Sequence, residues 1–421
     1  MKVLMVSEDV PHMSMGGLGK HAITLAKALV RCGCAVDFLG NDSIAYERVS
    51  GELGFDGRFF AALKGVERGW KEGALGCFNP LRRPVVARHM ASAISNLAPL
   101  YDVVHYHGHF PNLGKYISGA VNFVQTRHDQ GGDCLIHTRF KDGAVCSDLA
   151  PASCARCASS MPTWLQSRVS SFSVSSYRQA VAASFRKHKT IFVSEAMRRN
   201  FARCAGSGQW GTVIHNFVDY QSIRTLSRNA PVSQDGLLNV FIAGKVAPPK
   251  GIEVFLQQYC PDPRPDMRVR IAGDGPDEKR LRQHFVSPLV ELLGWCSYGD
   301  VVKYTAAADA IVVPSVWEEP CATTVLEALA LGKPTFALCR GGTPELVAYQ
   351  RYPNQLKLFD TMEQLVAGLR GLEREVYRGT LDDFSGDVSY ATQRILEVYE
   401  SPKERYLAGD DYAPMARVLS M

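Results

Sequence analysis

The sequence predicts an α/β protein of two domains, each built on a parallel β-sheet with helices on its faces. Its length of 421 residues exceeds what one hydrophobic core usually holds. Short apolar runs rich in β-branched residues alternate with segments of helical periodicity in both halves of the chain. A polar stretch between them, residues 214–238, has the Pro, Asn, Asp, Ser and Gly content of a linker.

The first half opens with an apolar strand at residues 2–7, a helical pattern at 17–32 and a second strand at 35–40. This order repeats loosely, which indicates a Rossmann-like domain with a parallel sheet. The further expected strands are PVVARH at 84–89, YDVVHYH at 101–107, VNFVQTRHD at 121–129 and TIFVS at 190–194.

The second half resumes the same alternation after the polar stretch. Its expected strands lie at residues 239–246, 268–275, 289–295, 310–315 and 334–339, with a helix at 323–331. We therefore predict an N-terminal domain at residues 1–220 and a C-terminal domain at 221–387. The final helical stretch, within residues 388–421, could pack back on the first domain.

The composition excludes several classes of protein. Hydrophobic residues at 46% and charged residues at 21% describe a globular chain rather than a disordered one. The apolar runs are far shorter than the ~20 residues of a membrane-spanning helix. The N-terminus lacks the apolar length and the cleavage site of a secretory signal, so we expect a cytoplasmic protein.

The charge is unevenly distributed along the chain. Residues 1–220 hold 25 Lys and Arg against 16 Asp and Glu, whereas the remainder holds 22 against 26. A basic first half suits a phosphate-bearing acceptor or peripheral contact with the inner face of an anionic membrane, and an ordinary solvated surface fits the numbers nearly as well. We expect no nucleic acid partner.

The segment PSVWEEPCATTVLEALALGKP, residues 314–334, carries the strongest chemical signal. It begins where the expected strand 310–315 ends, and open α/β sheets bind ligands at that edge. Glu319 and Glu327 flank a helix start, so the backbone amides of Cys321, Ala322 and Thr323 can face a diphosphate. Each carboxylate can accept hydrogen bonds from sugar hydroxyls. The alternative is a solvated loop acid and a glutamate favoured by the helix dipole.

The segment FIAGKVAPPKG, residues 241–251, also follows a strand. Lys245 and Lys250 lie beside Gly244 and Gly251, and glycines allow close approach of a backbone to a ligand. Two cations can stabilise the charge that grows on a departing diphosphate. The alternative is a pair of surface lysines.

The loop EDVPHMSMGGLGKH, residues 8–21, places Gly16 and Gly17 before a helix. The spacing of Gly17, Gly19 and Ala22, with Asp37 after it, matches a dinucleotide fingerprint, so an NAD-dependent enzyme is an alternative. That fingerprint starts almost directly after its strand, whereas about nine residues separate the strand from Gly17 here, which argues against it.

Two further groups of residues are candidates for a site. His128 follows an expected strand, and His105, His107 and His109 alternate in sequence; we interpret these three as polar lining of an acceptor site rather than as a metal set. The four cysteines of a C-x11-C-x7-C-x2-C pattern could hold a structural zinc ion, with free thiols as the alternative. They are Cys134, Cys146, Cys154 and Cys157.

These motifs together resemble glycosyltransferase family 4, which comprises retaining enzymes of the GT-B fold, with two Rossmann-like domains that face each other across a cleft. The E-x7-E pattern carries the resemblance, and HNFVD, IAGDGP, LGW and RGGTPELV extend it in order along the chain. The resemblance implies that Glu319 faces the transferred sugar and that Glu327 binds the ribose. It also implies that His128 lies near the sugar and that the amides of Gly16 and Gly17 approach the donor.

The chain departs from the family pattern in two places. Lys245 stands where the family usually has Arg, so the charge remains but bidentate contact with phosphate is lost. Cys321 and Ala322 replace Phe-Gly, which leaves the amides available but could change how the loop turns. We still assign Lys245 and Lys250 to the leaving diphosphate.

The expected activity is transfer of a sugar, with retention of anomeric configuration, from a nucleotide-sugar to an acceptor hydroxyl. We favour a UDP-sugar over a GDP-sugar, and a glycan, lipid-linked or small-molecule acceptor in bacterial polysaccharide or glycoconjugate synthesis. No cofactor is expected for catalysis, and zinc would be structural only. The rivals are a nucleotide-sugar epimerase of the same fold and a non-catalytic nucleotide-sugar-binding protein.

Overall fold

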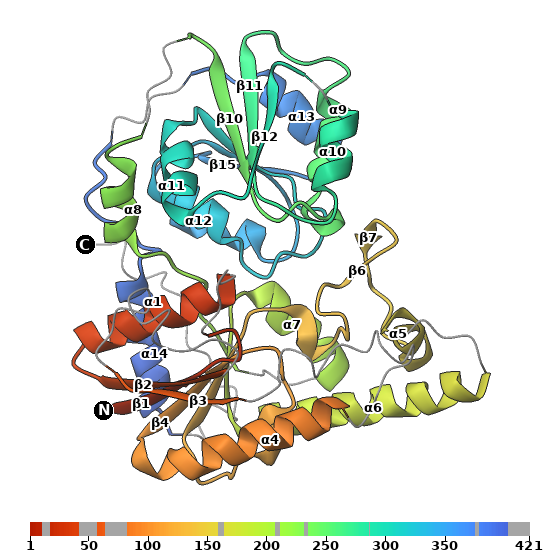
Figure 1. Cartoon of the computed structure of the whole chain (residues 1–421), viewed down its shortest axis with the longest axis vertical. Helices are drawn as coiled ribbons and strands as arrows, with labels where there is room; N and C mark the ends of the chain where they lie inside the picture. Colours follow the sequence, from red (N-terminus) through yellow and green to blue (C-terminus); the bar gives the residue numbers. More distant parts are fainter. Residues whose placement is uncertain are drawn as a thin grey trace. The chain divides into compact units, whose positions relative to one another are not determined.

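The computed structural model describes residues 1–10, 17–41, 57–63, 82–158, 164–206, 211–230, 235–285, 287–374 and 379–402. The chain divides into two compact units by its internal contacts (Figure 1). The first unit comprises Met1–His137, Asp148–His215 and Thr392–Met421, and the second comprises Thr138–Ser147 and Asn216–Ala391. Each unit contains a parallel sheet of its own.

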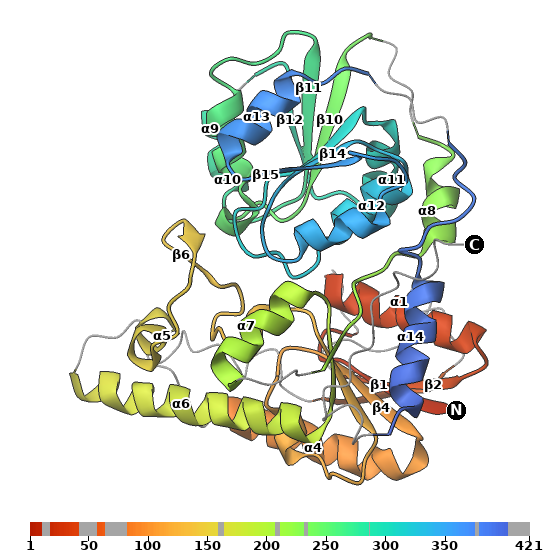
Figure 2. The same ribbon diagram turned by 180° about the vertical axis from the view of Figure 1, so that it is seen from behind.

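The first unit contains a seven-stranded sheet of order β3-β2-β1-β4-β5-β8-β9 in which all neighbours are parallel. Both faces of β1, β4 and β5 are buried, as expected for a parallel sheet covered by helices on either side (Figures 1 and 2). The strands are β1 (Lys2–Val6), β2 (Ala35–Asn41), β3 (Phe59–Leu63), β4 (Val103–His107), β5 (Phe123–Arg127), β8 (Lys189–Phe192) and β9 (Thr212–Val213).

The helices of this unit include one that the sequence analysis assigned wrongly. PVVARH belongs to helix α4 (Arg82–Leu97), not to a strand. Pro84 lies in the first turn of α4, where proline is tolerated, and MASAISNL continues the helix beyond the β-branched pair. The other helices are α1 (Gly17–Arg31), α5 (Pro151–Ala158), α6 (Trp164–Lys187) and α7 (Glu195–Ala205), with short 3-10 turns at Ala98–Leu100, Leu113–Tyr116 and Gln130–Gly132.

The last described helix, α14 (Val388–Glu400), crosses from the second unit to the first. Its end packs on the first unit through buried polar contacts. The Tyr399 hydroxyl lies 2.7 Å from Nδ1 of His105, and Lys189 Nζ donates to the carbonyl oxygens of Val398 and Tyr399 at 2.8 and 3.0 Å. The C-terminal helix therefore closes one side of the first sheet.

The second unit contains a six-stranded parallel sheet of order β12-β11-β10-β13-β14-β15. Its strands are β10 (Leu238–Ala243), β11 (Met267–Ala272), β12 (Val290–Gly294), β13 (Ala310–Val313), β14 (Thr335–Leu338) and β15 (Leu356–Phe359). Its helices are α8 (Tyr220–Ser227), α9 (Ile252–Tyr259), α10 (Glu278–His284), α11 (Tyr298–Ala307), α12 (Thr323–Ala330) and α13 (Met362–Arg370), with 3-10 turns at Pro248–Lys250 and Thr343–Tyr349.

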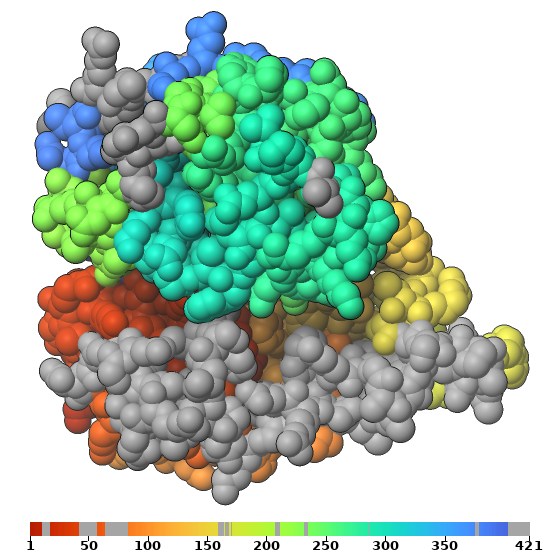
Figure 3. All heavy atoms as spheres, turned by 45° about the horizontal axis from the view of Figure 1, so that its top comes forward, coloured from red at the N-terminus to blue at the C-terminus, as the bar shows by residue number. Residues whose placement is uncertain are grey.

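The core of the second unit lies between the sheet and its helices. Phe255 and Leu256 of α9 and Leu365 and Leu369 of α13 are fully buried against the apolar residues of the strands. The space-filling view shows one outer face of this unit, formed by residues coloured green to cyan (Figure 3). A short antiparallel hairpin, β6 (Phe140–Lys141) with β7 (Ala144–Val145), comes from the first half of the sequence but belongs to this unit.

The order of strands creates a switch point in each sheet. In the second unit β10 lies between β11 and β13, so the loops that follow β10 and β13 leave adjacent strands at the same edge. Open α/β sheets bind ligands in the crevice at such a point. The prediction of two α/β halves with parallel sheets is therefore confirmed. No helix in the described part of the chain is long and apolar enough to span a membrane.

Candidate active site

A buried ion pair joins the two loops at the switch point of the second unit. Glu319, in the loop after β13, is 5% exposed, and its Oε1 lies 2.5 Å from Nζ of Lys250 in the loop after β10. The Ser315 hydroxyl donates to the same carboxylate oxygen at 2.6 Å. Lys250 also lies over the ring of Trp317, 5.0 Å from its centroid. The carboxylate is therefore held by groups from both loops.

Backbone contacts fix the two loops against each other. Gly251 has φ 67°, and a Cβ built on it would collide with the carbonyl oxygen of Pro314, so only glycine fits here. The amide of Val316 donates to the carbonyl oxygen of Pro249 at 3.0 Å. These contacts place Lys250 beside Glu319.

The ion pair keeps Glu319 charged. Burial by itself raises the pKa of this carboxyl group, but the Lys250 ammonium and the hydrogen bonds from Lys250 and Ser315 outweigh it, so the pKa lies below its ordinary value. An ionised carboxylate accepts hydrogen bonds through both of its oxygens. Glu319 is thus suited to bind hydroxyl groups at neutral pH.

Helix α12 begins directly after this loop, as its sequence predicts. Its N-cap residue, Ala322, has no side chain that could accept a hydrogen bond from the first-turn amides. Cys321 and Ala322 are buried, and Asn216 Nδ2 donates to the Cys321 carbonyl oxygen at 2.9 Å. The amides of this turn, including that of Thr323, are not capped by the N-cap residue. Such a helix start can bind an anion.

Glu327 lies in α12 and is contacted by a residue that the sequence analysis missed. The Tyr298 hydroxyl at the start of α11 hydrogen-bonds the Glu327 carboxylate. Burial and the nearby Glu327 charge both raise the pKa of Tyr298, so the phenol stays protonated and donates. Tyr298 therefore orients this carboxylate. No local motif marks it, because it precedes Glu327 by a whole helix and strand.

The remaining sequence-predicted donor residue of this unit is Lys245. It is exposed and follows Gly244 in the same loop as Lys250. The second unit thus gathers Lys245, Lys250, Glu319 and Glu327 around one edge of its sheet.

A cluster of imidazoles lies at the switch point of the first sheet. His105 and His107 alternate on β4 and face the same side, with ring centroids 4.1 Å apart. His128 directly follows β5, and its Nε2 lies 3.0 Å from Nδ1 of His107. The ring of His21, on α1, lies 4.4 Å from that of His128, centroid to centroid. Burial lowers the pKa of all four rings, to about 3 for His21 and His105.

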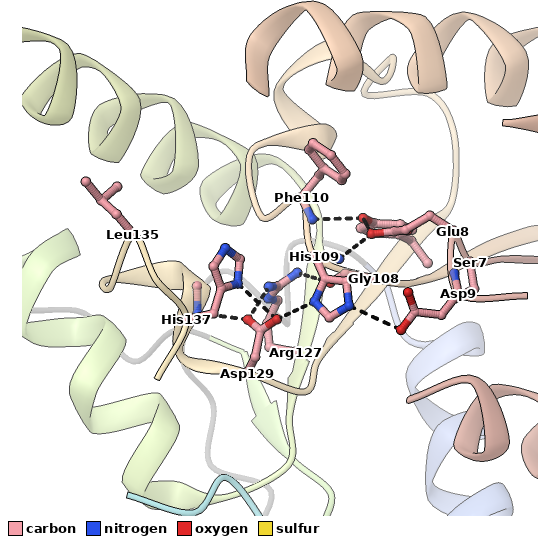
Figure 4. A network of polar contacts seen from close by, with 12 residues as sticks. Ser7, Glu8, Asp9, Gly108, His109, Phe110, Arg127, Asp129, Leu135 and His137 are labelled. Atoms are coloured by element: carbon pink, nitrogen blue, oxygen red, sulfur yellow. Dashed lines mark hydrogen bonds and ion pairs between the residues drawn. The ribbon is translucent and has the colours of Figure 1, made fainter. Parts of the chain in front are cut away.

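His109 does not join its sequence neighbours, because β4 ends at His107. Its ring lies between two carboxylates, 2.7 Å from Asp129 and 3.2 Å from Asp9 (Figure 4). Burial lowers the pKa of His109, but these carboxylates outweigh it and hold the pKa well above its ordinary value. Asp129 also contacts His137 and Arg127, at 3.0 and 3.1 Å. His109 and Arg127 are therefore the cations of an ion-pair network.

A third carboxylate, that of Glu8, supports this network. Glu8 accepts hydrogen bonds from the His109 amide and, at 3.0 Å, from the Tyr106 hydroxyl. A Cβ on Gly108 would meet the Glu8 carboxylate, so a larger residue here would require that carboxylate to move. The sequence analysis did not single out Glu8 or Asp129, since their partners follow different strands.

Comparison with known proteins decides the family. A model described as Glycosyltransferase Family 4 matches residues 15–222, and one described as Glycosyl transferases group 1 matches residues 238–372. Together they match most of the chain. The protein is a glycosyltransferase of the family 4 type.

Relatives of this glycosyltransferase support the assignment. An uncharacterized glycosyltransferase of Methanocaldococcus jannaschii is 26% identical over 374 residues, 83% of each chain. A GDP-mannose-dependent alpha-mannosyltransferase of Mycolicibacterium smegmatis is 30% identical over 165 residues, 39% of this chain and 42% of the relative.

Solved structures show the GT-B fold. Anabaena HepE, crystallised with UDP and glucose, is similar with a TM-score of 0.62 and 19% identity over 96% of this chain and 100% of that one. Sucrose-phosphate synthase from Thermosynechococcus elongatus has a TM-score of 0.60 at 15% identity, covering 94% of each chain.

The dinucleotide-binding alternative would need Asp37 to bind a ribose, but Asp37 makes other contacts in this glycosyltransferase. Asp37 lies within β2 and contacts Arg58 Nη2 at 3.0 Å and the Tyr101 hydroxyl at 2.5 Å. It is therefore part of a structural contact. Of the glycine pair, Gly17 opens α1 and is exposed, whereas Gly16 lies outside the described residues.

The possible zinc site of the four cysteines stays a prediction. Among the described residues, the groups of three or more potential ligands close enough for one ion are His21, His107, His128 and His109, Asp129, His137. Cys134, Cys154 and Cys157 belong to the first unit and form no such group, whereas Cys146 belongs to the second unit. The sulfur of Cys154 instead accepts a hydrogen bond from Arg178 at 3.1 Å.

Arg139 and Glu318 form an ion pair next to Glu319 that the sequence did not predict. Arg139 is buried beside the hairpin β6–β7, and its Nε lies 2.8 Å from Oε2 of Glu318. Arg139 has φ 48°, a conformation that is costly for a residue other than glycine. A segment from the first half of the sequence thus contributes to the second unit beside the loop that carries Glu319. The two residues are 179 positions apart, so no local pattern predicts the pair.

Proposed function

We propose that this glycosyltransferase transfers a sugar from a nucleotide-sugar to an acceptor hydroxyl with retention of anomeric configuration. The observation that carries the proposal is the buried contact of Glu319 with Lys250, directly before the start of α12. It combines an anion for sugar hydroxyls, a cation for phosphate and a helix start that can bind a diphosphate.

Each residue has a role in this proposal. The amides of Cys321, Ala322 and Thr323 and the ammonium groups of Lys245 and Lys250 bind the diphosphate. Glu319 binds the sugar and Glu327, oriented by Tyr298, binds the ribose. His128, Gly16, Gly17 and Gly244 complete the donor site.

The reaction follows from these roles. The bond between the anomeric carbon and the diphosphate oxygen breaks, and the two lysines stabilise the negative charge that develops on the leaving group. The acceptor hydroxyl attacks from the same face, and its proton passes to the departing oxygen. No cofactor is needed, because the lysines supply the positive charge that a metal would otherwise provide.

We propose UDP as the nucleotide, in preference to GDP. Support for UDP comes from the fold neighbour HepE, whose structures contain UDP, whereas the mycobacterial relative is named for GDP-mannose. The proposed acceptor is a bacterial polysaccharide or a glycoconjugate, and the proposed location is the cytoplasm.

The first unit offers a surface for peripheral contact with the inner face of the membrane. Trp164 and Phe172 on α6 are 68% and 77% exposed. They are eight residues apart, on one face of the helix, with Arg168 between them and its guanidinium 4.5 Å above the Trp164 ring. The part of α6 that carries them extends past the sheet of its unit (Figures 1 and 2). Aromatic and basic residues favour the headgroup region of an anionic bilayer.

Calorimetry on two variants tests the donor site. We expect Glu327→Ala to weaken binding of UDP and of the intact donor alike, by about 1–3 kcal/mol, because a charged hydrogen bond to the ribose is lost. Glu319→Ala should leave UDP affinity nearly unchanged while it reduces transfer. Equal loss of UDP binding in both variants would refute these assignments.

The product distinguishes transfer from the rival reactions. With donor alone, an epimerase changes the sugar, whereas this enzyme should at most hydrolyse the donor slowly. With acceptor present, NMR of the product should show the anomeric configuration of the donor. An inverted product would contradict the retaining mechanism.

A further inference from the structure

Two adjacent glutamates in the loop after β13 are held by cations from different parts of the chain. Glu319 contacts Lys250, and Oε2 of Glu318 accepts a hydrogen bond from Nε of Arg139 at 2.8 Å. Arg139 comes from the segment Thr138–Ser147, which belongs to the second unit although the residues directly before and after it belong to the first. None of the roles assigned to the transfer reaction uses Arg139 or Glu318.

We propose that Arg139 is a positioning residue for the transfer: by holding Glu318, it fixes the direction in which the carboxylate of Glu319 faces the transferred sugar. The inference rests on the proposed role of Glu319 as the group that binds this sugar. Arg139 itself does not contact the sugar, since its side chain is 2% exposed and its guanidinium faces Glu318. It acts through the loop that carries both glutamates.

The backbone of the two glutamates decides where the sugar-binding carboxylate points. Lys250 and Ser315 both contact Oε1 of Glu319, so they fix one end of this carboxylate. The direction of the other oxygen then depends on where the backbone places the Cα atom. A group that binds a reacting substrate has to be held within about 0.5 Å of its productive position. The backbone of residues 318–319 therefore needs anchors of its own.

The described structure supplies an anchor from each of two segments. The loop after β14 provides the first, because the Gly342 amide donates to the Glu319 carbonyl oxygen at 2.7 Å. Gly341 has φ 57°, and a Cβ there would collide with the backbone of Glu318 and Glu319. The contact of Arg139 with the Glu318 side chain is the second anchor. Loss of Arg139 would leave the pair of glutamates held by the first anchor alone.

The hairpin β6–β7 gives Arg139 a rigid support. Its turn residues Asp142 and Gly143 have φ 51° and 80°, the left-handed conformations of a tight two-residue hairpin turn. The Cys146 amide donates to the Arg139 carbonyl oxygen at 2.7 Å, which extends the ladder of the hairpin to Arg139. Arg139 is also held at φ 48°. Costly conformations of this kind persist where the surrounding structure determines them, and they cluster at functional sites.

Burial distinguishes this ion pair from others in the second unit. The Arg139 side chain is 2% exposed, whereas the arginines of the pairs Arg270–Glu291 and Arg282–Glu278 are 25% and 45% exposed. Solvent screens an exposed pair, so its partners exchange easily with water. A buried guanidinium that leaves its carboxylate has no such replacement. The contact of Arg139 therefore resists rearrangement, as a positioning contact must.

Kinetics of isosteric variants test the proposal. The probe is UDP-glucose or GDP-mannose, whichever the full-length parent turns over faster, and the released nucleoside diphosphate is measured. We expect Arg139→Met to lower kcat by about tenfold or more, since a displacement of about 1 Å caused by a remote change can reduce a rate by about 100-fold. The affinity for the free nucleoside diphosphate, measured by calorimetry, should be unchanged, because Glu319 is not assigned to the nucleotide.

A conservative variant and a double variant separate positioning from a general structural role. Arg139→Lys should recover most of the lost turnover, because it keeps a positive charge for Glu318. In Arg139→Met with Glu318→Met, apolar groups replace both partners, which is often neutral for stability. This double variant should be as stable as the parent in urea and yet as slow as Arg139→Met. Arg270→Met is the matched control, since it breaks the pair with Glu291 and should leave turnover unchanged.

The outcomes distinguish this inference from the proposed donor site. Parent-like turnover in the folded double variant, no recovery in Arg139→Lys, or an equal loss of turnover and nucleoside diphosphate affinity in Arg139→Met would each overturn the positioning role. Glu319→Ala is measured in parallel. If it is slow while Arg139→Met is not, only the positioning role is refuted. If Glu319→Ala turns over donor as the parent does, the proposed sugar site is wrong, and this inference fails with it.

Discussion

At the scale of single residues, the chemistry of the donor site depends on one buried carboxylate. Glu319 stays ionised because Lys250 and Ser315 contact it, and a buried anion without such partners would take up a proton. The same contacts join Glu319, the proposed sugar-binding group, to Lys250, the proposed phosphate-binding group. A change in either residue should therefore affect both stability and activity.

Replacing Lys245 and Lys250 one at a time should separate the effect on turnover from the effect on stability. We expect Lys250→Ala to lower turnover by roughly tenfold or more, because charge on the leaving diphosphate loses its partner. It should also lower the free energy of unfolding by about 1–3 kcal/mol, since Glu319 is left buried without its cation. Lys245→Ala, at an exposed position, should lower turnover with little change in stability. Steady-state kinetics and urea unfolding give both values, and unchanged turnover in both variants would contradict the assignment.

The lowered pKa of Glu319 predicts a dependence of stability on pH. The unfolded chain takes up the Glu319 proton at higher pH than the folded protein does, so the stabilisation is complete above the unfolded pKa. It is lost as the pH falls through the folded pKa. The difference in unfolding free energy between the parent and Glu319→Gln should therefore shrink as the pH falls below about 4.5, the ordinary pKa of a glutamate. The exposed Glu291→Gln is the control, and a difference that grows toward acid would have the wrong sign.

At the scale of elements, the site depends on the way two loops meet beyond parallel strands. The loops after β10 and β13 are brought together by strand order and fixed by backbone hydrogen bonds. Gly251 makes this approach possible. The position of Lys250 is thus decided by backbone packing rather than by its own side chain.

Gly251→Ala should disrupt this contact. We expect a loss of stability of at least about 1–2 kcal/mol from the left-handed backbone alone, with a further loss from the collision with Pro314. Donor binding should fall with it, because Lys250 moves. Gly236 of the same unit has φ 77° with open space around it, so Gly236→Ala isolates the backbone cost. If urea unfolding gave Gly251→Ala and Gly236→Ala the same stability, the close approach of Gly251 to the Pro314 carbonyl would contribute nothing to stability.

At the scale of the whole molecule, the two units carry different charge and different surfaces. The first half of the sequence is basic, and α6 of the first unit presents exposed aromatic residues. The second unit holds most of the candidate donor residues, among them Lys250, Glu319 and Glu327. This division suits an enzyme that meets a membrane with one unit and binds a nucleotide with the other.

Vesicle sedimentation tests the membrane contact. We expect the protein to bind vesicles containing phosphatidylglycerol better than pure phosphatidylcholine, because basic residues are attracted to anionic lipid. Trp164→Ala and Phe172→Ala should each weaken this binding by roughly tenfold, as expected if a large apolar side chain is buried on binding. Trp295→Ala is the matched control, since Trp295 is 66% exposed on the second unit. A specific role for α6 would be refuted if Trp295→Ala also lost binding. It would equally be refuted if all three variants bound vesicles as well as the parent does.

Local sequence patterns were sufficient to predict the fold class and the residues of the E-x7-E segment. Alternating apolar runs specify parallel sheets, and a helix start after a buried strand is local, so Glu319, Ala322 and Glu327 could be placed from neighbouring residues. PVVARH was assigned wrongly because short apolar runs occur in strands and in helices alike.

Only the tertiary structure decided which distant residues meet. The pairs Glu319–Lys250, Glu327–Tyr298 and Glu318–Arg139 join residues on different elements, and strand order sets which elements are neighbours. The contact between the rings of His21 and His128 also joins different elements. His109 lies apart from His105 and His107 because β4 ends at His107. Local periodicity carries no information on strand order, because long-range contacts are formed by packing of complete elements.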